Sequence, residues 1–90
     1  MGVVKIKIVE ENTIQGVLLE SYEILKKVNI ESYLLDSQLL LGKVLNRDKL
    51  FIMINRDFKL NMKQENEFFR LIQIRGDKMP IKYILGTCEF

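Results

Sequence analysis

Apolar side chains recur every three or four residues along most of this 90-residue chain, and this spacing constrains the fold more than any other feature. The first such stretch follows Asn12 and Thr13, either of which can cap a helix that we expect over about residues 14–28. Its apolar positions are Ile14, Val17, Leu18, Tyr22, Leu25 and Val28. Side chains at this spacing share one helix face, so the pattern predicts a helix packed against other elements.

A second helix is expected to begin at Ser32, which can act as its cap, with Asp36 near its positive N-terminal end. Its apolar positions are Leu35, Leu39, Leu40, Val44 and Leu45. Gly42 lies inside this stretch and suggests that another helix packs closely there. Asp48 can cap the next run, residues 49–54, which is too short for its periodicity to separate helix from strand. We interpret it as a short helix because its neighbours are helical.

Two more helices are predicted in the last third of the chain. Asn61 and Gln64 have the spacing of a capping box. The helix that follows carries Met62, Phe68, Phe69, Leu71 and Ile72. Gly76 would end it, Pro80 suits the first position of a short helix over residues 80–85, and Gly86 would terminate that one.

The expected fold is therefore all-α, a small antiparallel bundle of four to five helices over residues 13–86. Residues 1–12 form a separate segment in which apolar and charged side chains alternate from Val4 to Ile8. This alternation favours a short strand or an extended arm.

Few residues in the chain are suited to catalysis. Histidine is absent, which excludes Ser-His-Asp and Cys-His arrangements and histidine-containing metal sites. The single cysteine, Cys88, cannot form an intramolecular disulfide, and a reducing cytoplasm is the expected location. Five scattered glycines do not make a nucleotide-binding loop, and the longest apolar run, 50–54, is far too short to span a membrane. We expect no catalytic, cofactor-binding or metal-binding residue in this chain, and no membrane partner.

The basic residues are concentrated in the second part of the chain. Residues 37–90 contain ten Lys and Arg against six Asp and Glu. Four of these cations, Arg47, Lys49, Arg56 and Lys59, flank the predicted third helix and are the candidate partner-binding residues. Asp48 and Asp57 lie among them, so a nucleic-acid surface is less favoured than solvated charge or a protein-binding face.

Two stretches resemble a known family. The first is Leu35-Asp36-Ser37-Gln38-Leu39-Leu40-Leu41, which continues through Gly42 to Arg47. The second is Pro80-Ile81-Lys82-Tyr83-Ile84-Leu85-Gly86-Thr87-Cys88-Glu89-Phe90. In sequence and in mutual spacing they are similar to the N-terminal domain of the HemK/PrmC-type protein-(glutamine-N5) methyltransferases, which modify peptide chain release factors. Lys78-Met79 stand before Pro80 where Gly-Glu is common in that family.

The resemblance implies a five-helix domain that helps an S-adenosylmethionine-dependent methyltransferase engage the release factor whose Gly-Gly-Gln glutamine is modified. Cofactor binding and methyl transfer would belong to a catalytic domain beyond this chain, so the chain alone would not be an enzyme. Residues 87–90 would begin the linker to that domain. The junction residues implied are Pro80, Tyr83, Gly86, Glu89 and Phe90. The alternative is a different class of function, in which the chain is a free-standing helical adaptor or RNA-associated module.

Overall fold

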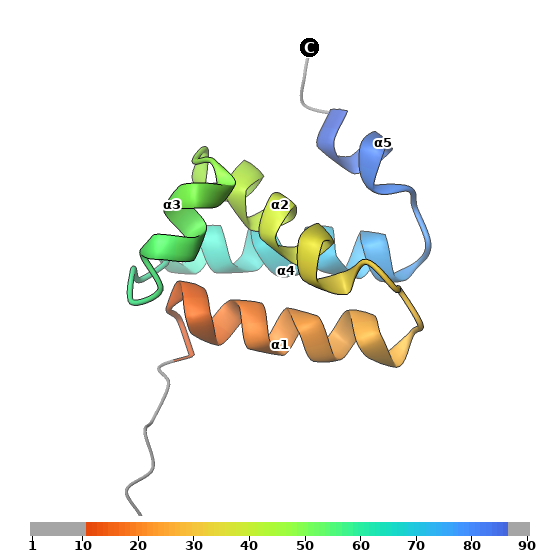
Figure 1. Cartoon of the computed structure of the whole chain (residues 1–90), viewed down its shortest axis with the longest axis horizontal. Coiled ribbons are helices and arrows are strands. Elements are labelled where there is room, and N and C mark those ends of the chain that lie inside the picture. The colour runs from red at the N-terminus through yellow and green to blue at the C-terminus, as the bar shows by residue number, and fades with distance from the viewer. Residues whose placement is uncertain (1–10, 87–90) are drawn as a thin grey trace, which may run out of the picture.

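The computed structural model describes residues 11–86, and this part of the chain folds into five helices without a strand (Figure 1). They are α1 (Ile14–Lys27), α2 (Tyr33–Leu45), α3 (Lys49–Ile54), α4 (Met62–Gly76) and α5 (Ile81–Gly86). The prediction of a small all-α bundle is confirmed, and residues 49–54 are helical as interpreted. The strand or arm expected over residues 1–12 lies almost wholly outside the described residues.

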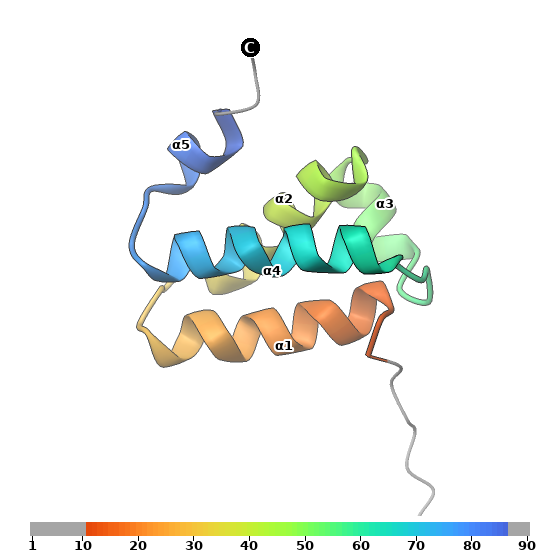
Figure 2. The same ribbon diagram turned by 180° about the vertical axis from the view of Figure 1, so that it is seen from behind.

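Three longer helices make the body of the bundle. Helices α1 and α4 lie side by side and run in the same direction, while α2 packs against both and carries the chain back (Figures 1 and 2). The short helix α3 packs on α2 at the end where α1 and α4 begin. Helix α5 packs on α2 and α4 at the other end. The two short helices therefore lie at opposite ends of the bundle.

The core lies between α1, α2 and α4 and collects thirteen buried apolar side chains from all five helices and the connections between them. They are Ile14, Val17, Leu18, Leu25, Ile30, Leu40, Leu41, Ile52, Leu60, Phe68, Leu71, Ile72 and Ile84. Fully burying one such side chain stabilises a fold by about 1.5–3 kcal/mol, so this cluster is the main source of stability.

Some positions assigned to the core by periodicity are exposed. Leu35 is 46% exposed and Met62 is 74% exposed, while Leu41, which the expected apolar set omitted, is completely buried. Helix α2 packs against both α1 and α4, so its buried face is wider than a single row of residues at helical spacing. Asp36 and Ser37 are drawn into that face beside Leu40 and Leu41.

The predicted caps of α1, α3 and α4 are present. Thr13, Asp48 and Asn61 each accept a hydrogen bond from a backbone N–H in the first turn, and Gln64 completes the capping box. The prediction for Ser32 is wrong, because its side chain accepts no hydrogen bond from a backbone N–H of α2. The Ser32 hydroxyl donates instead to Asp36 Oδ2 at 2.9 Å, because the buried carboxylate is a strong acceptor that needs donors.

The close approach predicted at Gly42 involves a turn and not another helix. A Cβ atom placed on Gly42 would lie 2.7 Å from the Arg47 carbonyl oxygen, in the turn that follows α2. That turn reverses at Asn46, whose φ of 58° is left-handed. The glycine that faces another helix is Gly76, where a Cβ would lie 3.8 Å from Leu25 of α1 and 3.8 Å from Val28, which directly follows α1.

Helix α4 ends at Gly76 as predicted, but the left-handed residue that turns the chain is Lys78, with φ of 77°. This is the position where glycine is common in the family that the sequence resembles, and glycine adopts such a φ without strain. Helix α5 begins one residue later than predicted, directly after Pro80, and includes Gly86. No helix among the described residues is long and apolar enough to cross a membrane.

Candidate functional site

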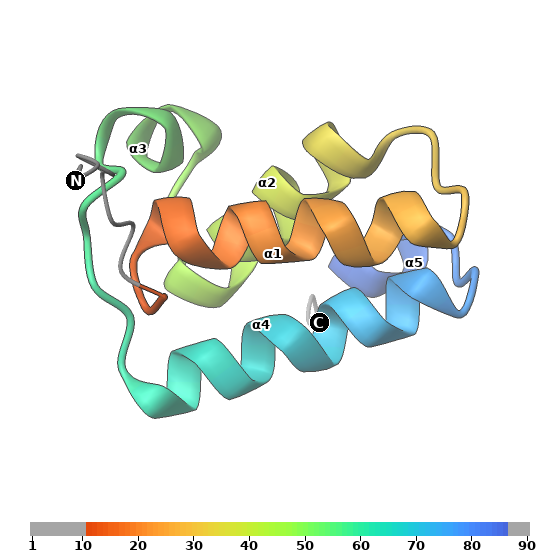
Figure 3. The ribbon, with the colours of Figure 1, turned by 90° about the horizontal axis from the view of Figure 1, so that it is seen from below.

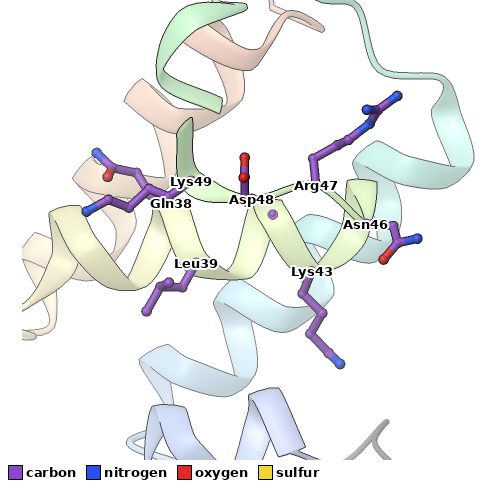
Figure 4. A pocket seen from close by; sticks show the side chains of 8 residues that line it. Gln38, Leu39, Lys43, Asn46, Arg47, Asp48 and Lys49 are labelled. Atoms are coloured by element: carbon purple, nitrogen blue, oxygen red, sulfur yellow. The ribbon is translucent and has the colours of Figure 1, made fainter. Parts of the chain in front are cut away.

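The α2–α3 turn borders an open hollow of about 480 Å³ on the surface of the bundle (Figure 4). Its lining residues are Gln38, Leu39, Gly42, Lys43, Asn46, Arg47, Asp48 and Lys49. Figure 4 shows Leu39 and Lys43 pointing away from α2 on one side, and Arg47 and Asp48 on the other. Two of the predicted partner-binding residues, Arg47 and Lys49, thus line one hollow.

A second open hollow, of about 420 Å³, lies on α3 and shares the same turn. It is lined by Asn46, Arg47, Asp48, Leu50, Phe51, Ile54 and Asn55. The Arg47 guanidinium lies over the Phe51 ring, 4.6 Å from its centroid, and Phe51 meets Phe58 edge to face at 5.5 Å. This cation–π contact holds Arg47 beside α3.

The other two predicted residues lie farther along the chain from the α2–α3 turn. Arg56 Nε donates to the Met53 carbonyl oxygen at 3.4 Å, which places its guanidinium by the last turn of α3. Lys59 lies in the connection to α4, where it pairs with Thr13 in an isolated antiparallel bridge. All four predicted cations are exposed. The structure brings Arg47 and Lys49 together at one hollow, and places Arg56 and Lys59 beyond the other end of α3.

Helix α3 also presents apolar side chains to solvent, which was not predicted from the sequence. Leu50 is 64% exposed, Ile54 is 66% exposed and Met53 lies beside them at 45%. Within α3 only Ile52 is fully buried. The signal was present in the sequence, because five consecutive apolar residues in a helix cannot all face one side.

The predicted junction residues that the structure describes lie at α5. Tyr83 is 62% exposed, so it does not complete the bundle core, and Ile84 is the residue of α5 that is buried. Pro80 precedes the helix, and the space around Gly86 is open. Glu89 and Phe90 lie outside the described residues.

A buried ion pair that was not predicted from the sequence joins α2 to α4 and fixes the connection that leads to α5. Arg75 Nε of α4 donates to Asp36 Oδ2 of α2 at 2.8 Å, and a second Arg75 nitrogen donates to the Met79 carbonyl oxygen at 3.0 Å. Lys43 Nζ of α2 reaches the Leu85 carbonyl oxygen at 3.4 Å. Polar contacts therefore set where α5 leaves the bundle.

The described residues contain no cluster of His, Cys, Asp and Glu that could hold a metal ion. Hydrogen bonding from Arg70 lowers the pKa of Glu67 below its ordinary value, and this pair is exposed on the surface of α4. The features that the site offers are exposed cations, apolar side chains and open hollows, which are features of binding surfaces.

Comparison with known proteins gives concordant matches. A family model described as the PrmC N-terminal domain matches residues 17–86. The chain is 52% identical over 77 residues to a release factor glutamine methyltransferase of Clostridium botulinum (strain Hall), covering 86% of this chain and 27% of that protein. It is 40% identical over 77 residues to the release factor glutamine methyltransferase of Clostridium acetobutylicum, with the same coverage.

A bifunctional methyltransferase of Rickettsia felis is 35% identical over 78 residues, covering 87% of this chain and 15% of that protein. The chain thus spans about a quarter of the length of the release factor glutamine methyltransferases that it matches. No solved structure matches it significantly.

Proposed function

Because this chain belongs to the PrmC N-terminal domain family, as an N-terminal domain of the release factor glutamine methyltransferases, we propose that it recognises the protein substrate of such an enzyme. In this role the chain binds the peptide chain release factor and orients its Gly-Gly-Gln glutamine. The catalytic domain, which would hold S-adenosylmethionine, carries out methyl transfer. The contribution of this domain is positioning, which lowers the entropic barrier to a reaction between two macromolecules.

The observation that carries the proposal is the group of exposed cations around α3. Arg47, Lys49 and Arg56 have no carboxylate partner within the part of the chain that the structure describes. Unpaired surface cations are available to steer and orient a protein with complementary charge. With Lys59 they form the partner-binding patch of the proposal.

The other end of the bundle provides the proposed junction with the catalytic domain. Tyr83 presents an exposed aromatic ring on α5, the last helix that the structure describes. An exposed ring of this kind is well suited to packing against a neighbouring domain. Pro80, Gly86, Glu89 and Phe90 complete the proposed junction.

Calorimetric titration of the chain with purified release factor tests the proposal, with S-adenosylmethionine as a control ligand. We expect heat from the release factor and none from the cofactor. The double charge reversal R47E/K49E should weaken binding about tenfold or more, because it turns attraction into repulsion. The double reversal K26E/K27E changes two exposed cations at the end of α1 by the same charge and should change affinity much less.

A chain that binds no release factor would contradict the recognition role. If R47E/K49E and K26E/K27E have equal effects, the cations at the α2–α3 turn are not the contact surface. The exposed cations also leave an RNA-associated module as the alternative. RNA binding would fall steeply with salt between about 50 and about 200 mM, whereas binding of a protein through a few charge pairs together with apolar contacts would fall less.

A further inference from the structure

The outer face of α3 is an unpartnered apolar surface. Leu50, Met53 and Ile54 stand at positions i, i+3 and i+4, so they share one face of the helix. All three are exposed. Three large apolar side chains on a six-residue helix are a high local density, and contiguous exposed apolar surface of this kind marks interaction sites.

This face is held in place by contacts of the other side chains of α3. Ile52 is completely buried in the core, and Phe51 packs edge to face on Phe58. The Asp48 carboxylate accepts a hydrogen bond from the Phe51 N–H at 3.0 Å and caps the helix. A helix this short is not stable by itself, so these contacts hold it and preform the surface.

Cations flank the apolar face at both ends. Arg47 is held over the Phe51 ring beside the start of α3, and Arg56 is hydrogen bonded to Met53 at its end. Lys49 lies in the first turn. Asp48 caps the helix and, like Asp57, keeps its negative charge, but residues 47–59 hold four cations against these two carboxylates and carry a net charge of +2.

We propose that the α3 face, meaning Leu50, Met53 and Ile54 with the flanking Arg47, Lys49 and Arg56, binds an amphipathic helical segment of a partner protein that carries Asp or Glu beside its apolar stripe. The hollow of about 420 Å³ has Leu50, Phe51 and Ile54 on its apolar side and is otherwise lined by Asn46, Arg47, Asp48 and Asn55; its apolar side contacts an apolar side chain of that segment. The carboxylates pair with the arginines, which bind them in bidentate fashion. If the partner is the release factor, this inference rests on the proposed function.

Two other occupants fit the face less well. Single-stranded RNA stacks successive bases on several exposed aromatic rings, but here Phe51 is covered by Arg47, which leaves only Phe58, 40% exposed, beside α3. A second copy of the chain would bring the same three cations against one another in a symmetric dimer. Helix α3 also lies at the opposite end of the bundle from α5, so a partner there would not compete with a domain joined behind α5 (Figure 3).

The test uses two synthetic helical peptides with the same leucine stripe, one flanked by Glu and the other by Lys, titrated by fluorescence anisotropy. We expect the Glu peptide to bind and the Lys peptide to bind at least tenfold more weakly. The variant L50S/I54S should reduce binding of the Glu peptide at least tenfold. The control L34S/L35S removes two leucines of α2 that are 51% and 46% exposed, and should leave binding unchanged.

Both variants change exposed side chains, and circular dichroism checks that they fold. The inference would be overturned if the two peptides bound with equal affinity, or if L50S/I54S bound the Glu peptide as tightly as the wild type does. It would also be overturned if the chain formed a concentration-dependent dimer that L50S/I54S abolishes. Titration with release factor distinguishes a failure of the proposed α3 contact from a failure of the proposed recognition role. Release factor that binds wild type and L50S/I54S equally overturns the α3 contact alone. Glu-peptide binding without release-factor binding supports the α3 contact and contradicts the recognition role.

Discussion

At the scale of single residues, Asp36 is unusual because a carboxylate is buried in the core of a small domain. It is 2% exposed and accepts hydrogen bonds from Arg75 of α4 and from Ser32 at the start of α2. Arg75 is itself mostly buried, with 16% of its side chain exposed. Burying these charges is tolerated because each is paired and hydrogen bonded. The same Arg75 also bonds to Met79, so one residue links α2, α4 and the connection to α5.

Replacing Asp36 by alanine should therefore destabilise the fold strongly, by about 2–4 kcal/mol, because it leaves a mostly buried guanidinium without its partner. Urea unfolding measures the change. The control is E67A, which breaks the exposed pair of Glu67 and Arg70 and should cost at most about 0.5 kcal/mol near neutral pH. The pKa of Glu67 is lowered, so its small contribution is present above its ordinary pKa and disappears as the pH falls through the lowered one. Equal effects of the two variants would show that the Asp36–Arg75 pair is not buried.

At the scale of elements, the ends of the helices determine how the bundle is connected. Helix α2 ends in a turn so tight that the Arg47 N–H bonds to the Gly42 carbonyl oxygen at 2.9 Å. The Arg47 carbonyl oxygen then lies against the Gly42 Cα, where no side chain fits. This turn places Arg47 and Asp48 directly before α3, and its residues line both hollows.

The substitution G42A should destabilise the protein by about 1–3 kcal/mol, even though alanine is normally the better helix former, because its Cβ would collide with backbone. The matched control is G76A in α4. There the Cβ would make ordinary contacts at 3.8 Å with two flexible side chains, and φ is not positive, so a gain of about 0.5–1 kcal/mol is expected. Thermal unfolding of the two variants should shift in opposite directions. A stabilising G42A would contradict the tight turn.

At the scale of the whole molecule, one core supports two surfaces at opposite ends of the bundle. Phe68 of α4 is the largest of the completely buried side chains and packs edge to face on the half-buried Phe69. Both residues were predicted as apolar positions of this helix, and the structure buries Phe68 completely and Phe69 in part. Because α3 and α5 are short, their surfaces keep their shape only while this shared core is intact.

Truncation of that core should therefore affect the whole domain. F68A is expected to cost about 3–5 kcal/mol, a large part of the stability of a domain this small. Urea unfolding followed by circular dichroism measures the loss, and F68L, which retains most of the volume, should cost clearly less. If F68A unfolded with an unchanged midpoint, the Phe68 side chain would not be packed in the core. L50S/I54S, which changes only exposed residues, serves as the variant expected to retain stability.

The helices, most of their caps and the family could be predicted from the amino-acid sequence. Helical spacing and caps such as Thr13, Asp48 and Asn61 act over three or four residues, so they can be recognised before the fold is known. The two motifs that resemble the HemK/PrmC N-terminal domain are confirmed by the family match over residues 17–86. Arg47 and Lys49 could be proposed as partners in binding because they are close in sequence and flank one short helix.

Which side of each helix is buried depends on how the helices pack together, and it could not be predicted from the sequence. Periodicity locates an apolar face, but the neighbours that cover it determine which rows of that face are hidden. For this reason Leu41 is buried and Leu35 exposed, Asp36 finds Arg75 thirty-nine residues away, and Leu50 and Ile54 face the solvent. The close approach at Gly42 and the reversal at Lys78 also depend on where the chain must go next. The candidate binding face on α3 is a product of packing, because the core takes only Ile52 in full from that helix and leaves its outer side uncovered.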